Sequence, residues 1–519
     1  MKPQKDQTLQ MWLRAQVSQQ PDAPAIVDTE GALSYAQLSD QVAALCSGLT
    51  QLGIGKGDVV GVQLPNLRAF VIAFLAVSAR GGIFQTLHMP YRSKELRGLL
   101  ADSQAKAVIA TNMQKDSRTT DILSIRSTLP DLDHVIVAGD APDGCVSLEA
   151  LLATRADPSD QIATDTDDRY LLLYTSGTTA APKGVPHSYR GFLNNALAAA
   201  AEMQIGTDGR ILSLAPMSHL YGLFTMHLSL ASGAAMVLLP AFNPATLLDD
   251  LTTAKATHIY AAPAHFAPFV ANGALTSDHL SDAKLLCLSG AAVPRALAQS
   301  VDGIMPGGSV VQLWGMSELQ AGTFGRPDDP AEKRFSTAGA CVPNTELRIL
   351  DEDGAVLDAG QQGALHVRGP SVFAGYLNRP DETTRAFDAD GWFATGDLAT
   401  LDADGFLTIT GRTKEIINRG GVKFNPIEVE EVLLSLAQIR QCAIVPIADP
   451  DLGERGCLCV ELAPGAEIDL EDVTAALSLA GMAKYKWPER LAVFETLPTT
   501  PTRKIMRGKL SQMIENQKG

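Results

Sequence analysis

The stretch Tyr174-Thr-Ser-Gly-Thr-Thr-Ala-Ala-Pro-Lys-Gly-Val185 is the most informative part of this sequence. It follows the apolar run Tyr170 to Leu173, and a helical pattern begins at about Ser188. Its small residues let backbone N–H groups approach a ligand, its hydroxyls can donate hydrogen bonds, and the Lys183 ammonium offsets negative charge. The composition therefore predicts a loop that binds a polyphosphate. A surface linker rich in Ser, Thr and Gly is the alternative for a loop of this composition.

The loop differs from the common nucleotide-binding motifs. In a Walker A loop the lysine lies between Gly and Ser or Thr, whereas Lys183 lies between Pro182 and Gly184. This difference disfavours an ordinary P-loop NTPase. The segment Gly53-Ile-Gly-Lys-Gly57 has the wrong glycine spacing for a dinucleotide fingerprint and precedes a predicted strand, so it predicts a turn.

Composition limits the class of protein and its partners. The 519 residues are 46% hydrophobic and 19% charged, which is typical of a multidomain globular protein. With 42 Lys and Arg against 58 Asp and Glu, the formal net charge is −16, so nucleic acid is not an expected partner. The seven cysteines form neither a CxxC pair nor a zinc set and are expected to be reduced. The chain shows neither a secretory signal nor a membrane span, and we expect it in the cytoplasm.

The pattern of apolar residues changes along the chain. Up to about residue 400, strands expected over 58–64, 107–110 and 134–138 alternate with helical patterns such as 67–79, which predicts an α/β layered architecture. From about residue 345, short strands with Asp-Gly turns are expected over 347–350, 364–367, 398–401 and 406–410. These strands predict a small antiparallel β unit within about 345–410.

A domain boundary is expected near Gly411. The basic, Gly-containing stretch from Gly411 to Gly421 leads into a helical pattern over 426–436 and a β run over 441–446. The prediction is one domain over 1–410 and a second domain over 411–519.

In its motifs, the chain resembles the acyl-adenylate-forming superfamily, which contains acyl-CoA synthetases, firefly luciferase and the adenylation domains of peptide synthetases. The phosphate loop of that family reads close to Thr-Ser-Gly-Thr-Thr-Gly-x-Pro-Lys-Gly, and this chain has Ala180 at the last-but-one Gly. Six more segments match in order: 215–222, 289–294, 314–318, 391–397, 411–414 and 501–505. The resemblance to the acyl-CoA ligase branch implies that 1–410 is a large N-terminal AMP-binding domain of layered α/β subdomains plus a β-barrel. It also implies that 411–519 is a mobile C-terminal α+β domain, with a hinge near 411–414.

The resemblance also implies a reaction. ATP and a carboxylic acid give acyl-AMP and pyrophosphate, and the acyl group then passes to the thiol of coenzyme A; ATP, Mg²⁺ and coenzyme A are the implied cofactors. The expected substrate is an organic acid of aliphatic, alicyclic or aryl type. The enzyme is expected to be a monomer or a homodimer. One alternative is a stand-alone adenylating enzyme that loads a carrier-protein pantetheine. Another is a nucleotide-binding homologue without catalysis, because Ala180 and Arg503 replace family glycines.

Site residues follow from the matched motifs. Asp397 would accept hydrogen bonds from the ribose hydroxyls with Arg412 behind it, although a turn residue is the alternative for a lone Thr-Gly-Asp. Glu318 would hold Mg²⁺, a cation that prefers oxygen ligands. The implied ATP and AMP site comprises Thr175, Ser176, Gly177, Thr178, Thr179, Lys183, Gly290, Ala291, Ala292, Trp314, Gly315, Met316, Ser317, Asp397 and Arg412.

Two residues are the implied catalytic groups. Lys504 would bridge the acid oxygen and the α-phosphate as charge builds, while Lys509 is expected on a solvated helix face. His219 would donate to the acid carboxylate, with a buried core histidine as the alternative. The implied acid pocket comprises His219, Tyr221, Gly222, Gly315 and Gly322. Lys414 would be the hinge of the alternating domain, and Gly420 and Gly421 would line the coenzyme A tunnel unless they form a simple turn.

Overall fold

The computed structural model describes residues 7–113, 117–175, 182–500 and 504–516. Within this part the chain forms two compact units. Unit 1 contains the described residues up to 346 together with 368–387, and unit 2 contains 347–367 and the described residues from 388 onward. The segment 388–410 therefore groups with the C-terminal part of the chain. The functional boundary and hinge at 411–414 remain predictions.

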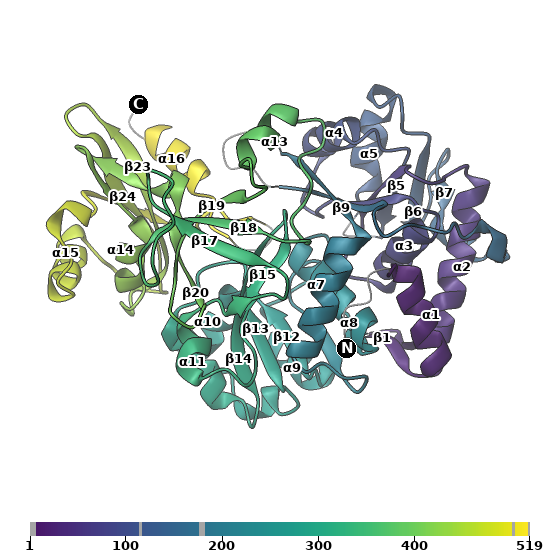
Figure 1. Ribbon diagram of the computed structural model, residues 1–519, viewed down its shortest axis with the longest axis horizontal. Coiled ribbons are helices and arrows are strands. Elements are labelled where there is room, and N and C mark those ends of the chain that lie inside the picture. Colours follow the sequence, from purple (N-terminus) through teal and green to yellow (C-terminus); the bar gives the residue numbers. More distant parts are fainter. Residues whose placement is uncertain (1–6, 114–116, 176–181, 501–503, 517–519) are drawn as a thin grey trace. The chain divides into compact units, whose positions relative to one another are not determined.

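The first sheet of unit 1 has seven strands. Figure 1 labels its strands β5, β6, β7 and β9. Every strand pair in it is parallel except the last one, between β8 and β9, which is antiparallel. In spatial order the strands are β7 (Val146–Ser147), β6 (His134–Gly139), β5 (Ala107–Asn112), β3 (Val59–Gln63), β4 (Ile83–Thr86), β8 (Arg169–Tyr174) and β9 (Gly184–Ser188). The helices of this part are α1 (Leu9–Gln19), α2 (Tyr35–Gln51), α3 (Arg68–Ala79), α4 (Ser93–Asp102), α5 (Thr119–Ile125) and α6 (Leu148–Leu152).

The second sheet of unit 1 has nine strands. Its central strands pair in parallel, and antiparallel pairs finish both edges. In spatial order the strands are β16 (Ala340–Cys341), β15 (Gln320–Phe324), β14 (Ser309–Met316), β13 (Leu285–Leu288), β12 (His258–Ala261), β10 (Arg210–Ser213), β11 (Ala235–Val237), β1 (Pro24–Asp28) and β2 (Gly31–Ser34). The remaining helices of unit 1 are α7 (Tyr189–Glu202), α8 (Leu220–Ser232), α9 (Leu247–Ala254), α10 (Pro263–Ala271), α11 (Arg295–Ile304), α12 (Ala331–Ser336) and α13 (Pro380–Ala386).

The apolar patterns explain these layers. Central strands such as β5 and β13 are buried along most of their length, as parallel strands covered on both faces are. Helix α8 is buried on almost every side, and its sequence is correspondingly apolar all round. The predicted α/β architecture is therefore confirmed. Among the described residues, no helix combines the length and the apolar character needed to span a membrane.

The β-rich segment of unit 2 forms a four-stranded sheet. Its strands follow sequence order: β17 (Glu346–Leu350), β18 (Gly363–Arg368), β19 (Phe393–Leu401) and β20 (Leu407–Arg412). The β-barrel implied by the resemblance is corrected here, because no pairing among the described residues joins β20 back to β17. A tight turn with Asp404 and Gly405 joins β19 to β20, whereas longer connections, one of them containing α13 (Pro380–Ala386), join the other strands.

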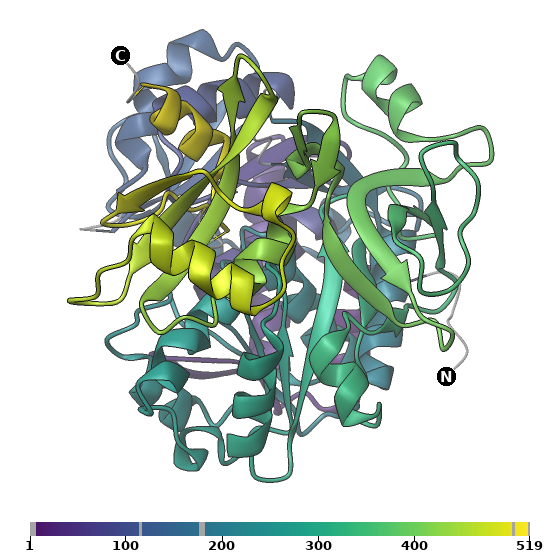
Figure 2. The same ribbon diagram turned by 90° about the vertical axis from the view of Figure 1, so that its left-hand side faces the viewer.

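The C-terminal part of unit 2 is a five-stranded sheet. Helices pack on both of its faces (Figure 2). Its strands are β21 (Ile417–Arg419), β22 (Val422–Phe424), β23 (Ile439–Asp449), β24 (Gly453–Leu462) and β25 (Arg490–Phe494), and its helices are α14 (Pro426–Leu433), α15 (Leu470–Leu479) and α16 (Arg507–Asn516). Alternate residues of β23 and β24 point to opposite faces. Ile444 and Leu458 pack with α14 and α15, whereas Val445 and Cys457 pack with α16. The predicted α+β character of this part is confirmed.

Candidate active site

Unit 1 gathers several predicted segments at one sheet edge. Strands β10, β12, β13 and β14 are parallel, so their carboxyl ends lie at the same edge. The segment 215–222 follows β10, the segment 289–292 follows β13, and the segment 314–318 completes β14 and the turn after it. In open α/β sheets the carboxyl edge is where ligands bind. The predicted adenine and acid segments are therefore close together in unit 1.

The phosphate loop connects β8 to β9. The Thr175 N–H donates to the Lys183 carbonyl oxygen over 3.1 Å and closes the base of the loop. The predicted residues Ser176, Gly177, Thr178 and Thr179, like Ala180, lie outside the described residues. On β9, the His187 Nε2–H donates to the Ser317 carbonyl oxygen over 2.6 Å, and burial lowers the pKa of His187 to about 3. An uncharged imidazole thus joins the loop hairpin to the segment 314–318.

Lys183 is linked to the predicted metal ligand through a tyrosine that the sequence analysis did not use. Its Nζ lies 3.8 Å from the centre of the Tyr376 ring and 3.4 Å from Glu382 Oε2. The Tyr376 hydroxyl donates to Glu318 Oε1 over 3.0 Å, and Glu318 is only 6% exposed. We call Lys183, Tyr376, Glu318 and Glu382 the lysine–glutamate cluster.

The other predicted nucleotide contacts take two forms. Gly290, Ala291 and Ala292 are exposed in the loop after β13, which the Ser289 hydroxyl ties to β14 by donating to the Leu313 carbonyl oxygen over 2.7 Å. Trp314 is buried, whereas Gly315, Met316 and Ser317 are partly exposed. A Cβ atom at Gly322 would lie 2.2 Å from the Trp314 ring, so the glycine makes room for the indole. Lining of the acid pocket by Gly315 and Gly322 remains a prediction.

His219 caps the N-terminus of α8. Its Nδ1 accepts a hydrogen bond from the Tyr221 N–H over 3.2 Å, so the proton of the neutral ring lies on Nε2. His219 is partly exposed. The Tyr221 side chain is buried, and its hydroxyl donates to the Cys287 carbonyl oxygen over 2.8 Å. Gly222 lets α8 pass close to the preceding turn, since a Cβ there would lie 2.3 Å from the Pro216 carbonyl oxygen.

Unit 2 brings the remaining predicted nucleotide and catalytic groups together. Asp397 and Arg412 face each other in the β19–β20 register, and Arg412 Nε donates to Asp397 Oδ1 over 2.8 Å. Asp397 is 4% exposed. Desolvation lowers the pKa of Lys504, and the Arg412 charge acts in the same direction, whereas Glu415 and Asp397 oppose the shift. The Lys504 ammonium therefore lies within the electrostatic field of the Asp397–Arg412 pair.

The chain on both sides of Lys504 is held by hydrogen bonds. Lys504 N–H donates to Thr500 Oγ1 over 3.1 Å, the Thr500 N–H donates to the Lys504 carbonyl oxygen over 2.8 Å, and Ile505 bridges to Thr499. Arg503, which replaces a family glycine, lies outside the described residues. Lys509 is exposed on α16.

A buried ion pair that the matched motifs do not include joins Glu430 to Arg507, which lies three residues after Lys504. Arg507 binds the two carboxylate oxygens of Glu430 through separate nitrogens at 2.6 Å each, and its Nε lies 3.1 Å from Glu415 Oε2. Glu430 also accepts the Ile444 N–H. The pair fixes the start of α16 to α14 and to the short helix Thr413–Glu415, which contains the predicted hinge residue Lys414.

Gly420 and Gly421 form the two-residue turn between β21 and β22. Their φ values of +59° and +86° are those that a type I′ hairpin turn requires at both positions. Lys414 is exposed. The roles of these residues in a coenzyme A tunnel and a hinge remain predictions.

Comparison with known proteins identifies the family. The family model "AMP-binding enzyme" matches residues 13–377, and the model "AMP-binding enzyme C-terminal domain" matches 428–504. The chain is 32% identical to the medium-chain fatty-acid–CoA ligase of Escherichia coli, over 94% of this chain and 87% of that protein. It is 32% identical to a salicylyl-CoA synthase / salicylate adenylyltransferase of Streptomyces, over 96% and 92%.

A solved structure agrees with these matches. The anthranilate CoA ligase AuaEII in complex with anthranoyl-AMP has a TM-score of 0.91 and 25% identity, covering 100% of both chains. The chain therefore belongs to the AMP-binding enzyme family, as its motifs predict. The names of its relatives are those of acid–CoA ligases, in agreement with the predicted reaction class.

Proposed function

We propose that this chain uses ATP to convert an organic carboxylic acid into acyl-AMP and pyrophosphate, and then transfers the acyl group to the thiol of coenzyme A. The observation that carries the proposal is the lysine–glutamate cluster. It connects a phosphate-loop lysine to a buried carboxylate at the carboxyl edge of the nine-stranded sheet. A cation for the phosphates and a carboxylate for a metal ion are what the handling of a triphosphate requires.

The residues present fit a magnesium ion. Glu318 offers a carboxylate already oriented by Tyr376, and Thr175 Oγ1 is a buried oxygen with no hydrogen-bond partner among the described residues. The part of the chain that the structure describes holds no cluster of three or more His, Cys, Asp or Glu side chains that could bind a metal ion. Mg²⁺ is usually held by one or two carboxylates plus substrate phosphates. Glu318 would hold the ion, which would neutralise phosphate charge.

We assign the other groups by what each can donate or accept. Asp397 accepts hydrogen bonds from the ribose hydroxyls while Arg412 holds its carboxylate in place. His219 donates from Nε2 to the acid carboxylate. Lys504 carries positive charge to the acid oxygen and the α-phosphate as negative charge develops between them.

The acid is proposed to be aliphatic, alicyclic or aryl. The aliphatic and aryl classes occur in the names of the relatives, which include a medium-chain fatty acid and salicylate. Free coenzyme A is the proposed acceptor, since the relatives are named as CoA ligases or synthases. A carrier-protein pantetheine is the alternative acceptor. A monomer or a homodimer remains the expected assembly.

Pyrophosphate release across a panel of carboxylic acids tests the proposal. We expect release that depends on both ATP and the acid, followed by a thioester when coenzyme A is added. A thioester formed only with holo carrier proteins would overturn the choice of free coenzyme A. ATP binding with background pyrophosphate release over the whole panel would favour the non-catalytic homologue instead.

Replacing Tyr376 with Phe tests the lysine–glutamate cluster. The variant keeps the ring beside Lys183 but removes the hydroxyl that donates to Glu318. A hydrogen bond to a charged group contributes roughly 1.5–3 kcal/mol, so we expect adenylate formation to slow by about 10- to 100-fold. The half-saturating Mg²⁺ concentration, measured by pyrophosphate release and by Mg²⁺-dependent thermal shift with ATP, should rise.

The partly exposed Tyr485 of unit 2 provides a matched control. Tyr485→Phe should leave the Mg²⁺ dependence unchanged. If Tyr376→Phe also leaves it unchanged, Tyr376 does not orient Glu318 for the metal.

A further inference from the structure

A second imidazole lies beside His219. The ring of His88, which follows β4, is nearly parallel to the His219 ring, with centroids 6.3 Å apart and planes inclined by 26°. His88 keeps part of its surface accessible, yet burial lowers its pKa to about 3 and the neighbouring His219 acts in the same direction. His88 is therefore uncharged near neutral pH and accessible next to the residue proposed to receive the acid carboxylate.

The hydrogen bond of His88 to Ser218 defines which nitrogen carries the proton. His88 Nδ1 lies 2.8 Å from Ser218 Oγ, and Ser218 is buried. Within the described part of the chain, this serine hydroxyl makes no other hydrogen bond. Because a buried hydroxyl donates to an acceptor within reach, we assign Ser218 as the donor and Nδ1 as the acceptor. The His88 proton then lies on Nε2, for which no hydrogen-bond partner occurs in the described ranges.

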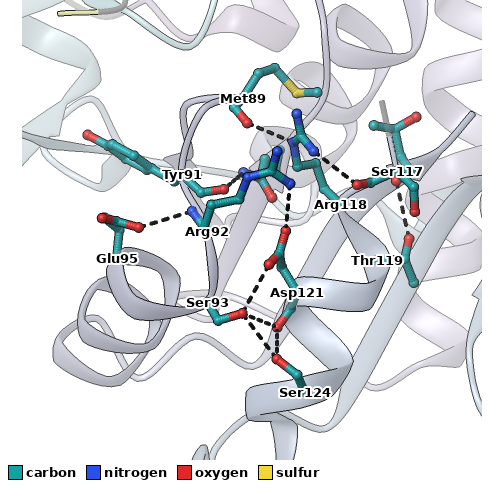
Figure 3. Close-up of polar contacts among 12 residues, drawn as sticks. Met89, Tyr91, Arg92, Ser93, Glu95, Ser117, Arg118, Thr119, Asp121 and Ser124 are labelled. Atoms are coloured by element: carbon teal, nitrogen blue, oxygen red, sulfur yellow. Dashed lines mark hydrogen bonds and ion pairs between the residues drawn. The ribbon is translucent and has the colours of Figure 1, made fainter. Parts of the chain in front are cut away.

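The backbone that carries His88 is held in place from two directions. Gln63 Nε2, at the end of β3, donates to the carbonyl oxygens of His88 and Tyr91 over 2.9 and 3.0 Å. From the other direction, Arg118 Nε donates to the Met89 carbonyl oxygen over 2.7 Å (Figure 3). Segment 88–91 is therefore held to two neighbouring parts of unit 1.

Further polar contacts continue this anchoring along the chain. Figure 3 shows Arg92 and Ser93, at the start of α4, both reaching the Asp121 carboxylate of α5, over 3.1 and 3.0 Å. Ser93 Oγ also lies 3.1 Å from Ser124 Oγ. A hydrogen bond selects between ligands only when the donor is held in one orientation. The structure provides this condition for the His88 backbone.

We propose that His88 is a specificity-determining residue of the acid site, and that its Nε2–H donates to a neutral acceptor oxygen that the acid carries close to its carboxyl group. This inference rests on the proposed function, because His219 must receive the carboxylate. The class of substrate is a hydroxy-, alkoxy- or oxo-substituted carboxylic acid. The His88 ring supplies no positive charge near neutral pH, so a second carboxylate beside it would lose hydration without gaining a counter-charge there. The spacing of the rings places the second oxygen a few bonds from the carboxyl carbon.

Matched pairs of acids test the proposal. The pairs are benzoic with 2-hydroxybenzoic and 2-methoxybenzoic acid, cyclohexanecarboxylic with its 2-oxo derivative, and hexanoic with 3-hydroxyhexanoic acid. For each, kcat/KM for pyrophosphate release is measured, and the ratio of oxygenated to parent acid is taken. We expect the wild-type ratio to favour the oxygenated member of at least one pair by about tenfold. His88→Phe keeps a ring but no donor and should bring this ratio close to one.

His88→Gln provides the conservative comparison, because its amide nitrogen can replace the Nε2 donor. It should retain part of the preference. His134→Phe removes an imidazole from β6 of the same sheet and should keep the wild-type ratio. A ratio between two acids on one preparation is independent of how much of a variant is folded.

Three results would overturn either the role of His88 or the proposed function. An unchanged ratio in His88→Phe, or a wild-type preference for the parent acid in every pair, overturns the role of His88 while the proposed function stands. No pyrophosphate release from the wild type with any acid overturns the proposed function and this inference with it.

Discussion

Lys504→Ala should slow adenylate formation by roughly 10²- to 10³-fold, the loss typical of removing one preorganised donor to a developing negative charge. Thioester formation from supplied acyl-AMP should stay within a few-fold of wild type, because the acyl phosphate is already formed and needs no bridge between acid and α-phosphate. The hydrogen bonds that hold the backbone of Lys504 to Thr500 do not involve the Lys504 side chain. Folding should therefore be preserved.

The measurement compares two half-reactions on one preparation. Acid-dependent pyrophosphate release reports the first, and acyl-CoA produced from synthetic acyl-AMP reports the second. Lys509→Ala, an exposed lysine on α16, is the matched control and should leave both rates unchanged. Equal loss of both half-reactions in Lys504→Ala would refute the assigned role.

The site residues that could be predicted from sequence lie inside compact motifs. The pairing of Asp397 with Arg412 is of this kind, since the two residues lie on neighbouring strands joined by one turn. The lysine–glutamate cluster could not be predicted in this way. Pro380 at the first turn of α13, followed by Asp381 and Glu382, indicates a helix start. Nothing in that local pattern indicates contact with a lysine about 200 residues earlier, because only tertiary packing brings the two together.

The same limit applies to the fold. Helix α3 (Arg68–Ala79) agrees closely with its predicted range because its apolar pattern is strong and local. Strand β19 was predicted only over 398–401, whereas it begins at Phe393. Gly396 and Asp397 weaken the strand pattern, and hydrogen bonds to β18 and β20 supply what local preference lacks. Closure of a sheet likewise depends on long-range pairing, which explains why the implied barrel was wrong.

Arg507→Met should destabilise unit 2 by about 3–5 kcal/mol, since it leaves the Glu430 carboxylate buried without its counter-charge. The side chain of Glu430 is 7% exposed and that of Arg507 is 18% exposed, so water screens the pair little. We expect the first unfolding transition in urea to move to lower concentration. Amide exchange in α14 and β23 should accelerate more than elsewhere.

Two further variants separate the ion pair from simple loss of a side chain. The double variant Arg507→Met with Glu430→Met replaces both charges of the buried pair by apolar groups and should recover most of the lost stability, because the buried Glu430 carboxylate is gone. The more exposed Glu415 loses its contact with Arg507 in both variants. Arg295→Met breaks an exposed ion pair with Glu332, in which the two side chains are 52% and 61% exposed, and it should lower the free energy of unfolding by less than about 1 kcal/mol.

Because Arg507 lies three residues after Lys504, Arg507→Met should also slow adenylate formation under conditions where the protein is still folded. Wild-type adenylation in a folded Arg507→Met variant would show that the pair stabilises unit 2 without positioning Lys504.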